Sequence, residues 1–206
     1  MNFLAHAYLS GAHESVLLGN FIADAVKGNH LNVFPGEVAL GIRLHREIDT
    51  YTDRHPSFLE SSHRIRHRYH KFSGIIVDIY YDHFLARHWS DYSGTPLPEY
   101  ASAIHRLLIG NYTMLPSRSR RILPFLVSQN WLLGYRYMHG LRRVFLGMDR
   151  RTGYRSGMKH AVEDLEGNYE GLQADFKRFF PEMVHQVIGF LDKNDLPVGD
   201  LRVSSG

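Results

Sequence analysis

Two aspartates lie four residues apart in the segment DIYYDHFLARHW, which is otherwise almost entirely apolar. If this segment is a helix, Asp78 and Asp82 lie on one face, one turn apart. A helix that is apolar nearly all round is expected to be buried, and two buried carboxylates would lose hydration and repel each other. We therefore expect a cation, or a group of histidine and arginine side chains, to neutralise the pair inside a helical core.

A second segment, GIRLHREIDTYTD, has a histidine and two aspartates at the same spacing. His45, Asp49 and Asp53 follow one another at intervals of four and so form one stripe along a helix. Imidazole and carboxylate groups at this spacing can share a divalent ion, because hard and borderline metals accept nitrogen and oxygen ligands. The stripe is a candidate metal site.

Two further polar residues are surrounded by apolar ones near the N-terminus. Asp24 lies in GNFIADAVKG and His6 in NFLAHAYLS, each on a separate predicted helix. A buried acid or imidazole needs a partner, because desolvation penalises its charged form. Together with the two segments above, these residues indicate that four helices contribute to one polar site.

Each candidate also has a purely structural interpretation. His6 could be a core histidine bonded to a backbone carbonyl, and Asp24 could pair with Lys27 or a distant arginine. The stripe on residues 45–53 could be a solvated face, and the pair at 78 and 82 could belong to an ion network with nearby arginines, Arg46 and Arg87. The coincidence of several sites favours function over any single motif.

The segment SHRIRHRYHKF has histidines at metal-like spacing as well: His63, His67 and His70. Arginines and a lysine alternate with them, and their charge would repel a cation. We interpret this segment as a basic, exposed helix face.

Length and composition indicate one domain. The chain has 206 residues, of which 44% are hydrophobic, enough for a single core. We expect a helical domain over residues 1–195 and a flexible tail over 196–206. The absence of cysteine excludes disulfides, thiolate metal sites and cysteine nucleophiles. We find neither a signal-peptide pattern nor a membrane-spanning stretch, so we expect a cytoplasmic protein that does not bind membranes.

The pattern of apolar residues is helical throughout, without the alternation of strands, and predicts an all-α fold of about nine helices. The expected helices cover residues 2–10, 15–28, 35–54, 57–71, 74–91, 97–110, 118–134, 137–148 and 156–192. Pro35 and Pro56 suit first-turn positions, and Ser117 suits an N-cap. Pro124 and Pro181 are expected to kink or split their helices.

Several of these segments, in their order and spacing, resemble the acyl carrier protein phosphodiesterase family. They are NFLAHAYLS, GNFIADAVKG, GIRLHREIDTYTD, DHFLARHW and QNWLLGYRYM, and the resemblance extends from residue 1 to about residue 190. It implies removal of 4′-phosphopantetheine from holo acyl carrier protein. It also implies an all-α domain distantly related to the HD phosphohydrolases and a divalent cation, Mn²⁺ or alternatively Mg²⁺.

The HD superfamily is named for adjacent histidine and aspartate ligands, and this chain departs from that pattern. Here His45 and Asp49 are four residues apart, and in Asp82-His83 the acid comes first. On the resemblance we predict a metal bound by Asp24, His45, Asp49 and Asp82. We expect three catalytic groups close to it: His6, Asp78 and His83.

The predicted groups suit phosphodiester hydrolysis. A divalent ion can activate water and neutralise charge on the phosphoryl oxygens. Asp78 could accept a proton from that water, and His83, His6 or an arginine could protonate or stabilise the departing serine oxygen. This chemistry requires no protein nucleophile, in agreement with the absence of cysteine and of a G-x-S-x-G segment.

Clustered arginines predict where the carrier protein, which is strongly acidic as a family, would bind. A tight group occurs at a predicted helix start, where the helix dipole does not favour positive charge. Such a surface would steer an acidic partner. The residues predicted to bind the partner are Arg46, Arg118, Arg120, Arg121, Arg142 and Arg143.

Two other functions remain open. The same site could hydrolyse a nucleotide or another small phosphodiester, in which case the arginines would matter little. Alternatively, the chain could be a helical nucleic-acid-binding protein, with binding that falls steeply with salt. The net charge of only +3 and the absence of a recognisable nucleic-acid-binding motif argue against nucleic acid as a partner.

Overall fold

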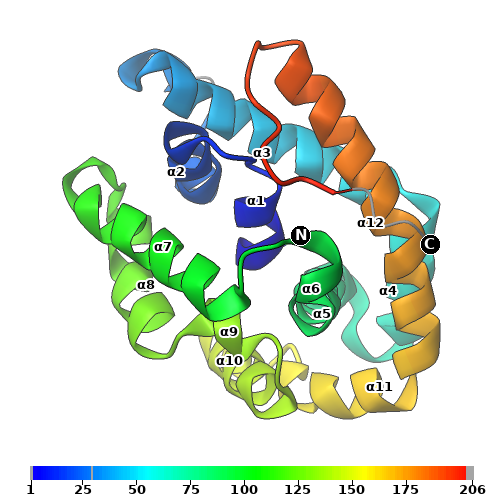
Figure 1. The fold of residues 1–206 in the computed structure, drawn as a ribbon. Helices are drawn as coiled ribbons and strands as arrows, with labels where there is room; N and C mark the ends of the chain where they lie inside the picture. The colour runs from blue at the N-terminus through cyan, green and yellow to red at the C-terminus, as the bar shows by residue number, and fades with distance from the viewer. Residues whose placement is uncertain (1, 29, 203–206) are drawn as a thin grey trace.

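The computed structural model describes residues 2–28 and 30–202, and all the regular elements within them are helical (Figure 1). The α-helices are α1 (Phe3–Tyr8), α2 (Glu14–Ile22), α3 (Gly36–Arg54), α4 (Pro56–Tyr69), α5 (Ser73–Arg87), α6 (Trp89–Tyr92), α7 (Leu97–Gly110), α8 (Ser117–Ser128), α9 (Trp131–Gly134), α10 (Met138–Arg151), α11 (Ala161–Gly167) and α12 (Tyr169–Asp192). Short 3₁₀ turns are η1 (Ala23–Ala25), η2 (His30–Val33), η3 (His70–Phe72), η4 (Tyr112–Met114) and η5 (Met158–His160). The predicted all-α class is confirmed.

The chain is divided into more and shorter helices than we predicted. The expected helix 118–134 is α8 and α9, separated at Asn130, whose left-handed backbone (φ 45°) ends one helix while its side chain caps the next. Pro124 and Pro181, by contrast, lie inside α8 and α12, and neither ends its helix. Neither proline splits its helix, so of the two predicted outcomes the splitting is wrong, and a kink stays a prediction.

Helices α2 and α3 pack with their backbones in direct contact. A Cβ atom added to Gly19 would lie 2.0 Å from the carbonyl oxygen of Val38, and one added to Gly41 would lie 2.0 Å from that of Val16. Only glycine fits at either position, so this pair of glycines sets the separation of the two helices. The close packing brings the polar residues of α2 and α3 together.

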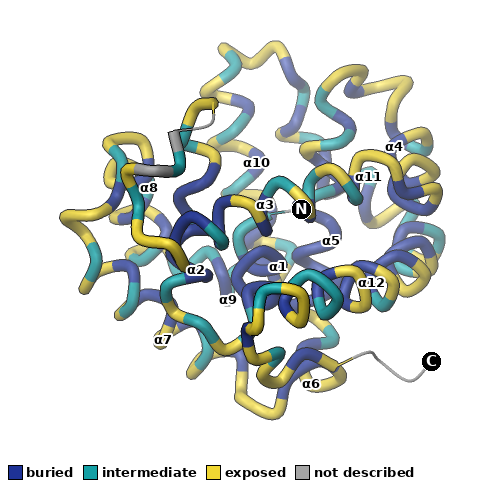
Figure 2. The backbone as a smooth tube through the Cα atoms, turned by 90° about the horizontal axis from the view of Figure 1, so that it is seen from above, coloured by how far each residue is buried: buried dark blue, intermediate teal, exposed yellow. Residues whose placement is uncertain are grey.

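Helix α5 runs through the centre of the fold, with α1, α4 and α12 around it (Figures 1 and 2). Its segment 76–86 is buried apart from the half-buried Asp78, as its nearly uniform apolar sequence predicts. Helices α7 to α10 cover one side of this core and α11 and α12 the other. No helix within the described residues is long and apolar enough to cross a membrane.

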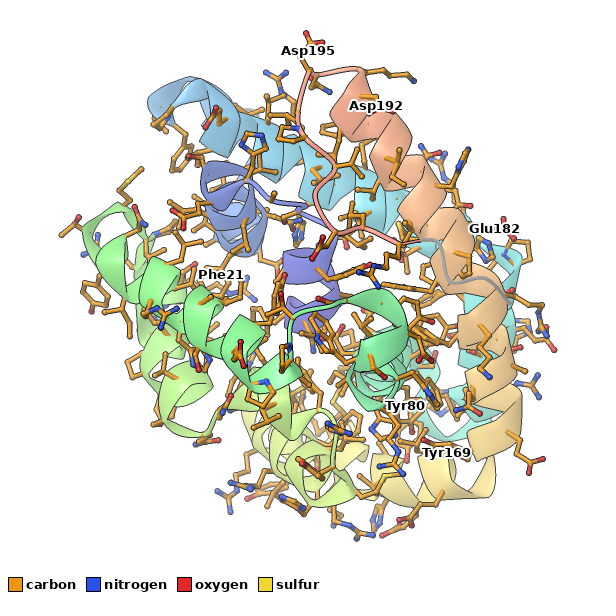
Figure 3. The ribbon with its side chains drawn as sticks, viewed as in Figure 1. Phe21, Tyr80, Tyr169, Glu182, Asp192 and Asp195 are labelled. Atoms are coloured by element: carbon orange, nitrogen blue, oxygen red, sulfur yellow. The ribbon has the colours of Figure 1, made fainter. Side chains whose placement is uncertain are left out.

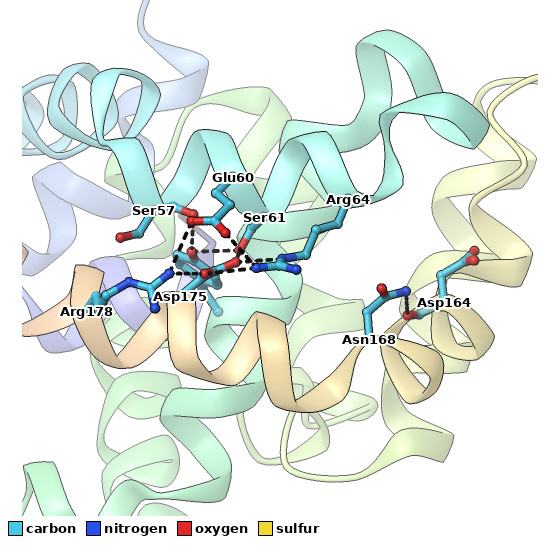
Figure 4. A network of polar contacts seen from close by, with 9 residues as sticks. Ser57, Glu60, Ser61, Arg64, Asp164, Asn168, Asp175 and Arg178 are labelled. Atoms are coloured by element: carbon cyan, nitrogen blue, oxygen red, sulfur yellow. Dashed lines mark hydrogen bonds and ion pairs between the residues drawn. The ribbon is translucent and has the colours of Figure 1, made fainter.

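A network of ion pairs between side chains connects α4 to α12 (Figure 4). Asp175, whose side chain is fully buried, accepts hydrogen bonds from Ser61 at 2.8 Å and from the Arg64 Nε at 3.0 Å, and also pairs with Arg178. Both arginines also pair with Glu60. Part of the arginine-rich face of α4 is therefore structural, while His63, His67 and His70 are exposed, as predicted.

The C-terminal segment after α12 returns to the domain as far as the structure describes it. Leu196 and Leu201 are buried, and the backbone N–H of Arg202 donates to the Tyr8 hydroxyl at 3.0 Å. Residues 203–206 of the predicted tail lie outside the described residues.

Candidate metal centre

Four elements contribute polar side chains to one cluster. His6 comes from α1, Asn20 from α2 and Asp24 from η1, and His45 and Asp49 come from successive turns of α3. The spacing of four residues on α3 puts an imidazole and a carboxylate on one face, and the glycine contact between α2 and α3 brings Asn20 beside them. Except for Asn20, all of these residues were predicted from the sequence to belong to the site.

Asn20 orients both imidazoles. Its amide nitrogen donates to the carbonyl oxygen of His6 and to the Ser10 hydroxyl, both at 3.0 Å, which fixes its amide oxygen on the side of the rings. That oxygen lies 2.8 Å from Nδ1 of His6 and 2.9 Å from Nδ1 of His45, so each ring donates to it from Nδ1. The Nε2 atoms of both rings are thereby left as the ones that face the carboxylates.

The two Nε2 atoms converge on the aspartates. The His6 Nε2 lies 3.3 Å from one carboxylate oxygen of Asp49, and the His45 Nε2 lies 3.1 Å from the other. The His45 Nε2 is also 3.5 Å from an oxygen of Asp24. Ligand atoms of His6, His45 and Asp49 all lie within 4.8 Å of one another, a separation at which one ion can contact all three.

The ionisation states of these side chains give the cluster a net negative charge. Burial lowers the pKa of His6 to about 4, and repulsion from His45 adds to the effect. Burial acts in the same direction on His45, but the carboxylates of Asp24 and Asp49 outweigh it and raise its pKa to about 9. The imidazoles in turn hold the pKa of Asp49 well below its usual range, despite its burial. Two carboxylates therefore share one imidazolium, which leaves room for a further positive charge.

The imidazoles are buried and the carboxylates face outward. Only 7% of the His6 side chain is exposed, against 44% of the Asp49 side chain. A small ion or a phosphate could therefore approach from the carboxylate side. Arg118 borders this side, because it donates to the carbonyl oxygen of Asp24 at 3.1 Å, whereas Arg46 donates to that of Gly28 at 2.7 Å.

Asp82 lies outside the cluster, which differs from its predicted place among the ligands. Its two carboxylate oxygens accept hydrogen bonds from the backbone N–H groups of Leu4 (2.9 Å) and Ala5 (3.1 Å). Asp82 thus anchors the first turn of α1, the helix that carries His6. Burial raises its pKa to about 7 although these hydrogen bonds oppose the shift.

Asp78 is half-buried one turn before Asp82 on α5. Burial raises the pKa of its carboxyl, and repulsion from Asp49 and Asp53 contributes. Asp53 itself is exposed, at the outer end of the stripe on α3.

The two hydrogen-bond partners of His83, which we predicted to lie beside the metal, are not residues of the cluster. Its Nδ1 donates to the carbonyl oxygen of Tyr135 at 2.8 Å, and its Nε2 accepts from the Tyr169 hydroxyl at 3.1 Å. Tyr169 is labelled in Figure 3, where it lies beside the lower part of the fold near α11 and α12. Both nitrogens of His83 are thus occupied in connecting α5 to α9 and α12, as in an ordinary core histidine.

The remaining arginines that we predicted to bind a partner have different surroundings. Arg120 donates to the carbonyl oxygen of Leu115 at 2.6 Å and lies over the ring of Tyr112, so it stabilises the turn before α8. Arg142 pairs with Glu166 at 3.7 Å. Arg121 and Arg143 are both exposed. Of these arginines, Arg118 contacts the backbone of a cluster residue, Asp24.

Sequence reasoning missed Asn20. A neutral amide carries no charge pattern, and its role depends on contacts with residues 14 and 25 positions away in the chain. Its position four residues before Asp24 on the same predicted helix was the available signal.

The fold and the cluster define an all-α protein with a hydrolase-like site, in which buried imidazoles and partly exposed carboxylates are held on packed helices. Known proteins narrow this class. The family model described as acyl carrier protein phosphodiesterase matches residues 1–183. Curated relatives called acyl carrier protein phosphodiesterase include one from Enterobacter sp. (strain 638) and one from Escherichia coli O6:H1, each 36% identical to this chain; each alignment covers 90% of this chain and 97% of the relative.

The chain belongs to the acyl carrier protein phosphodiesterase family and is thus an enzyme of the phosphodiester hydrolase class. No solved structure matches it, so the distant relationship to HD phosphohydrolases stays a prediction.

Proposed function

We propose that this protein hydrolyses the phosphodiester between 4′-phosphopantetheine and the serine of holo acyl carrier protein, releasing apo acyl carrier protein and 4′-phosphopantetheine in a reaction that depends on a divalent metal. One observation supports the metal above all others. The single amide oxygen of Asn20 accepts from both Nδ1 atoms, so His6 and His45 direct their Nε2 atoms toward the same carboxylate. A neutral hydrogen-bond acceptor behind two histidine ligands is the usual support of a metal site.

The residues fit a metal with a mixed preference for nitrogen and oxygen. His6, His45 and Asp49 would hold it, with Asp24 as a further carboxylate at the solvent side. Mg²⁺ prefers oxygen ligands and retains its water, whereas Mn²⁺ accepts imidazole more readily. We therefore propose Mn²⁺ as the native ion, with Mg²⁺ as a weaker substitute.

When bound, the ion would supply Lewis-acid activation of water and neutralise charge on the phosphoryl oxygens. Asp78 would accept the proton of the attacking water, a task suited to a carboxyl whose pKa is raised by burial. The Arg118 guanidinium, held at the carbonyl oxygen of Asp24, would stabilise negative charge on the phosphoryl group or on the departing serine oxygen. Asp82 would act indirectly, by fixing the helix that carries His6.

Mass spectrometry of purified holo acyl carrier protein tests this proposal. The carrier protein would be incubated with the enzyme and Mn²⁺, with enzyme and chelator, and with an Asp24→Ala variant. We expect conversion to the apo form, with release of 4′-phosphopantetheine, only in the first reaction. Conversion that proceeds equally well in chelator would contradict the proposed dependence on a metal. If the folded, Mn²⁺-loaded enzyme does not convert it, holo acyl carrier protein is not the substrate. Nucleotides and small phosphodiesters would then be tested as substrates.

A further inference from the structure

One long segment of the chain contains no acidic residue. Between Glu99 and Asp149 there is no aspartate, glutamate or lysine, and the positive charges are all arginines: Arg106, Arg118, Arg120, Arg121, Arg136, Arg142 and Arg143. The net charge of the whole protein is only +3, so acids elsewhere balance most of its positive charge. This segment folds into α7, α8, α9 and the larger part of α10, which lie together on one side of the molecule (Figure 1).

Helix α8 brings part of this positive charge to the candidate metal centre. Its first turn contacts η1, where Arg118 donates to the carbonyl oxygen of Asp24 at 3.1 Å. Arg121 and Phe125 follow Arg118 at i+3 and i+7, so the three side chains form one stripe along α8. We name these residues the α8 stripe. It begins at the metal centre and extends away from it over the surface.

The α8 stripe is exposed and ends in an aromatic ring. Arg118 and Arg121 are exposed, and Phe125 is 56% exposed, which is unusual for phenylalanine. Ile109 and Met114, from α7 and η4, are further exposed apolar residues of the same acid-free segment. Protein interfaces are enriched in aromatic residues, methionine and arginine, so this composition favours a protein partner over a nucleic acid.

We infer that the α8 stripe is the surface on which the acidic carrier protein docks, with an acid of the partner against Arg121 and an apolar side chain against Phe125, while Arg118 faces the phosphodiester. This inference rests on the proposed function. The stripe would orient the partner so that its modified serine reaches the Asp24 side of the metal centre. Arg142 and Arg143 belong to the same acid-free segment and would contribute longer-range attraction rather than contacts at the stripe.

Two substitutions in the stripe test the inference, and α4 supplies matched controls. Arg121→Glu reverses an exposed charge and Phe125→Ala removes the apolar anchor. The controls are Arg66→Glu and Leu59→Ala, because Arg66 is an exposed arginine and Leu59 is 45% exposed. For each variant, kcat and KM for holo acyl carrier protein would be measured with Mn²⁺, and circular dichroism would verify folding.

We expect each stripe variant to raise KM about tenfold, the effect of losing one interfacial anchor or one steering charge, while kcat changes less than about twofold. Raising the salt concentration should raise the KM of the wild type and should affect Arg121→Glu less. The α4 controls should keep the KM of the wild type. Stripe variants with an unchanged KM, in an enzyme whose wild type converts the carrier protein, would overturn the docking surface and leave the proposed function intact.

Two other results would also overturn the inference. If the folded, Mn²⁺-loaded wild type does not convert the carrier protein at all, the proposed function fails and the docking surface fails with it. If single-stranded RNA binds the wild type at 150 mM salt and Arg121→Glu abolishes that binding without changing the KM for the carrier protein, the stripe is a nucleic-acid surface instead.

Discussion

Asp175 and Asp49 are two acids of this protein with contrasting surroundings. Asp175 is fully buried, and its partners are the fixed cations Arg64 and Arg178 (Figure 4). Asp49 is partly exposed, and its partners are His6 and His45, which can lose their protons. An arginine stays charged and cannot bind a metal, whereas an imidazole can release its proton and coordinate one. The first arrangement connects two helices permanently, and the second is suited to exchange a proton for an ion.

The substitution Asp49→Asn should have the largest effect, because it removes a ligand and leaves the rest of the cluster in place. We expect the rate of carrier-protein conversion with Mn²⁺ to fall by about three orders of magnitude or more, since loss of the ion removes several kcal/mol of transition-state stabilisation. Mass spectrometry of timed reactions would measure the rate. Asp53→Asn, one turn further along α3 and exposed, is the matched control and should change the rate little.

Asp175→Ala should have the largest effect on stability. It leaves the buried Ser61 hydroxyl without the carboxylate to which it donates, and it removes the shared partner of Arg64 and Arg178. Both arginines are partly exposed and still pair with Glu60, so we expect a loss of about 3 kcal/mol of unfolding free energy, the upper end for an unsatisfied buried polar group. Urea unfolding would measure the loss. Glu60→Gln, in the same network but exposed, should cost less than about 1 kcal/mol. If Asp175→Ala were as stable as the wild type, the claim that Asp175 stabilises the contact between α4 and α12 would be contradicted.

Asp82→Asn should have an intermediate effect, on the stability of the fold and, through the helix that carries His6, on the metal site. The backbone N–H groups of Leu4 and Ala5 each donate to one carboxylate oxygen of Asp82, and the NH₂ of an asparagine would face one of these two donors. A buried donor without an acceptor costs about 1–3 kcal/mol, which thermal unfolding would detect. Asp91→Asn, on an exposed acid of α6, is the control. A loss of Mn²⁺ affinity with no change in stability would instead indicate that Asp82 binds the metal directly.

Addition of Mn²⁺ should give the smallest of these effects. An ion that binds only the folded protein stabilises it by RT ln(1 + [L]/Kd), which is about 0.4 kcal/mol when the ion concentration equals its Kd. We expect the midpoint of thermal unfolding to rise with Mn²⁺ in the wild type and in Glu60→Gln, and to stay constant in Asp49→Asn. A similar rise in Asp49→Asn would mean that the ion binds elsewhere on the protein.

Local spacing explains how much of the site could be read from the sequence. His45 and Asp49 are one turn apart on one helix, so their proximity follows from helix geometry alone. The same reasoning made Asp78 and Asp82 a pair, but the partners of Asp82 are 77 and 78 residues away in the chain, and only the tertiary fold shows that they are backbone N–H groups. Local spacing therefore identified the acids, but it did not distinguish a candidate metal ligand such as Asp49 from Asp82, which binds backbone N–H groups.

The fold shows the same division between local and long-range information. The apolar periodicity predicted helices throughout, and the structure confirms them. Their ends depended on single residues: Asn130 adopts a left-handed conformation and breaks a predicted helix, while Pro124 is accommodated inside α8. The contact of Gly19 with the backbone of α3, which positions Asn20, left no signal beyond the presence of a glycine.

Direct titration of the protein with Mn²⁺, followed by electron paramagnetic resonance of the free ion, tests the central claim that His6, His45 and Asp49 form a metal site. Our account predicts binding of Mn²⁺ by the metal-free wild type, retention of that binding in Asp53→Asn, and its loss in Asp49→Asn and in His45→Ala. Binding of equal affinity in the wild type and in both site variants, or no binding by the folded wild type, would contradict it.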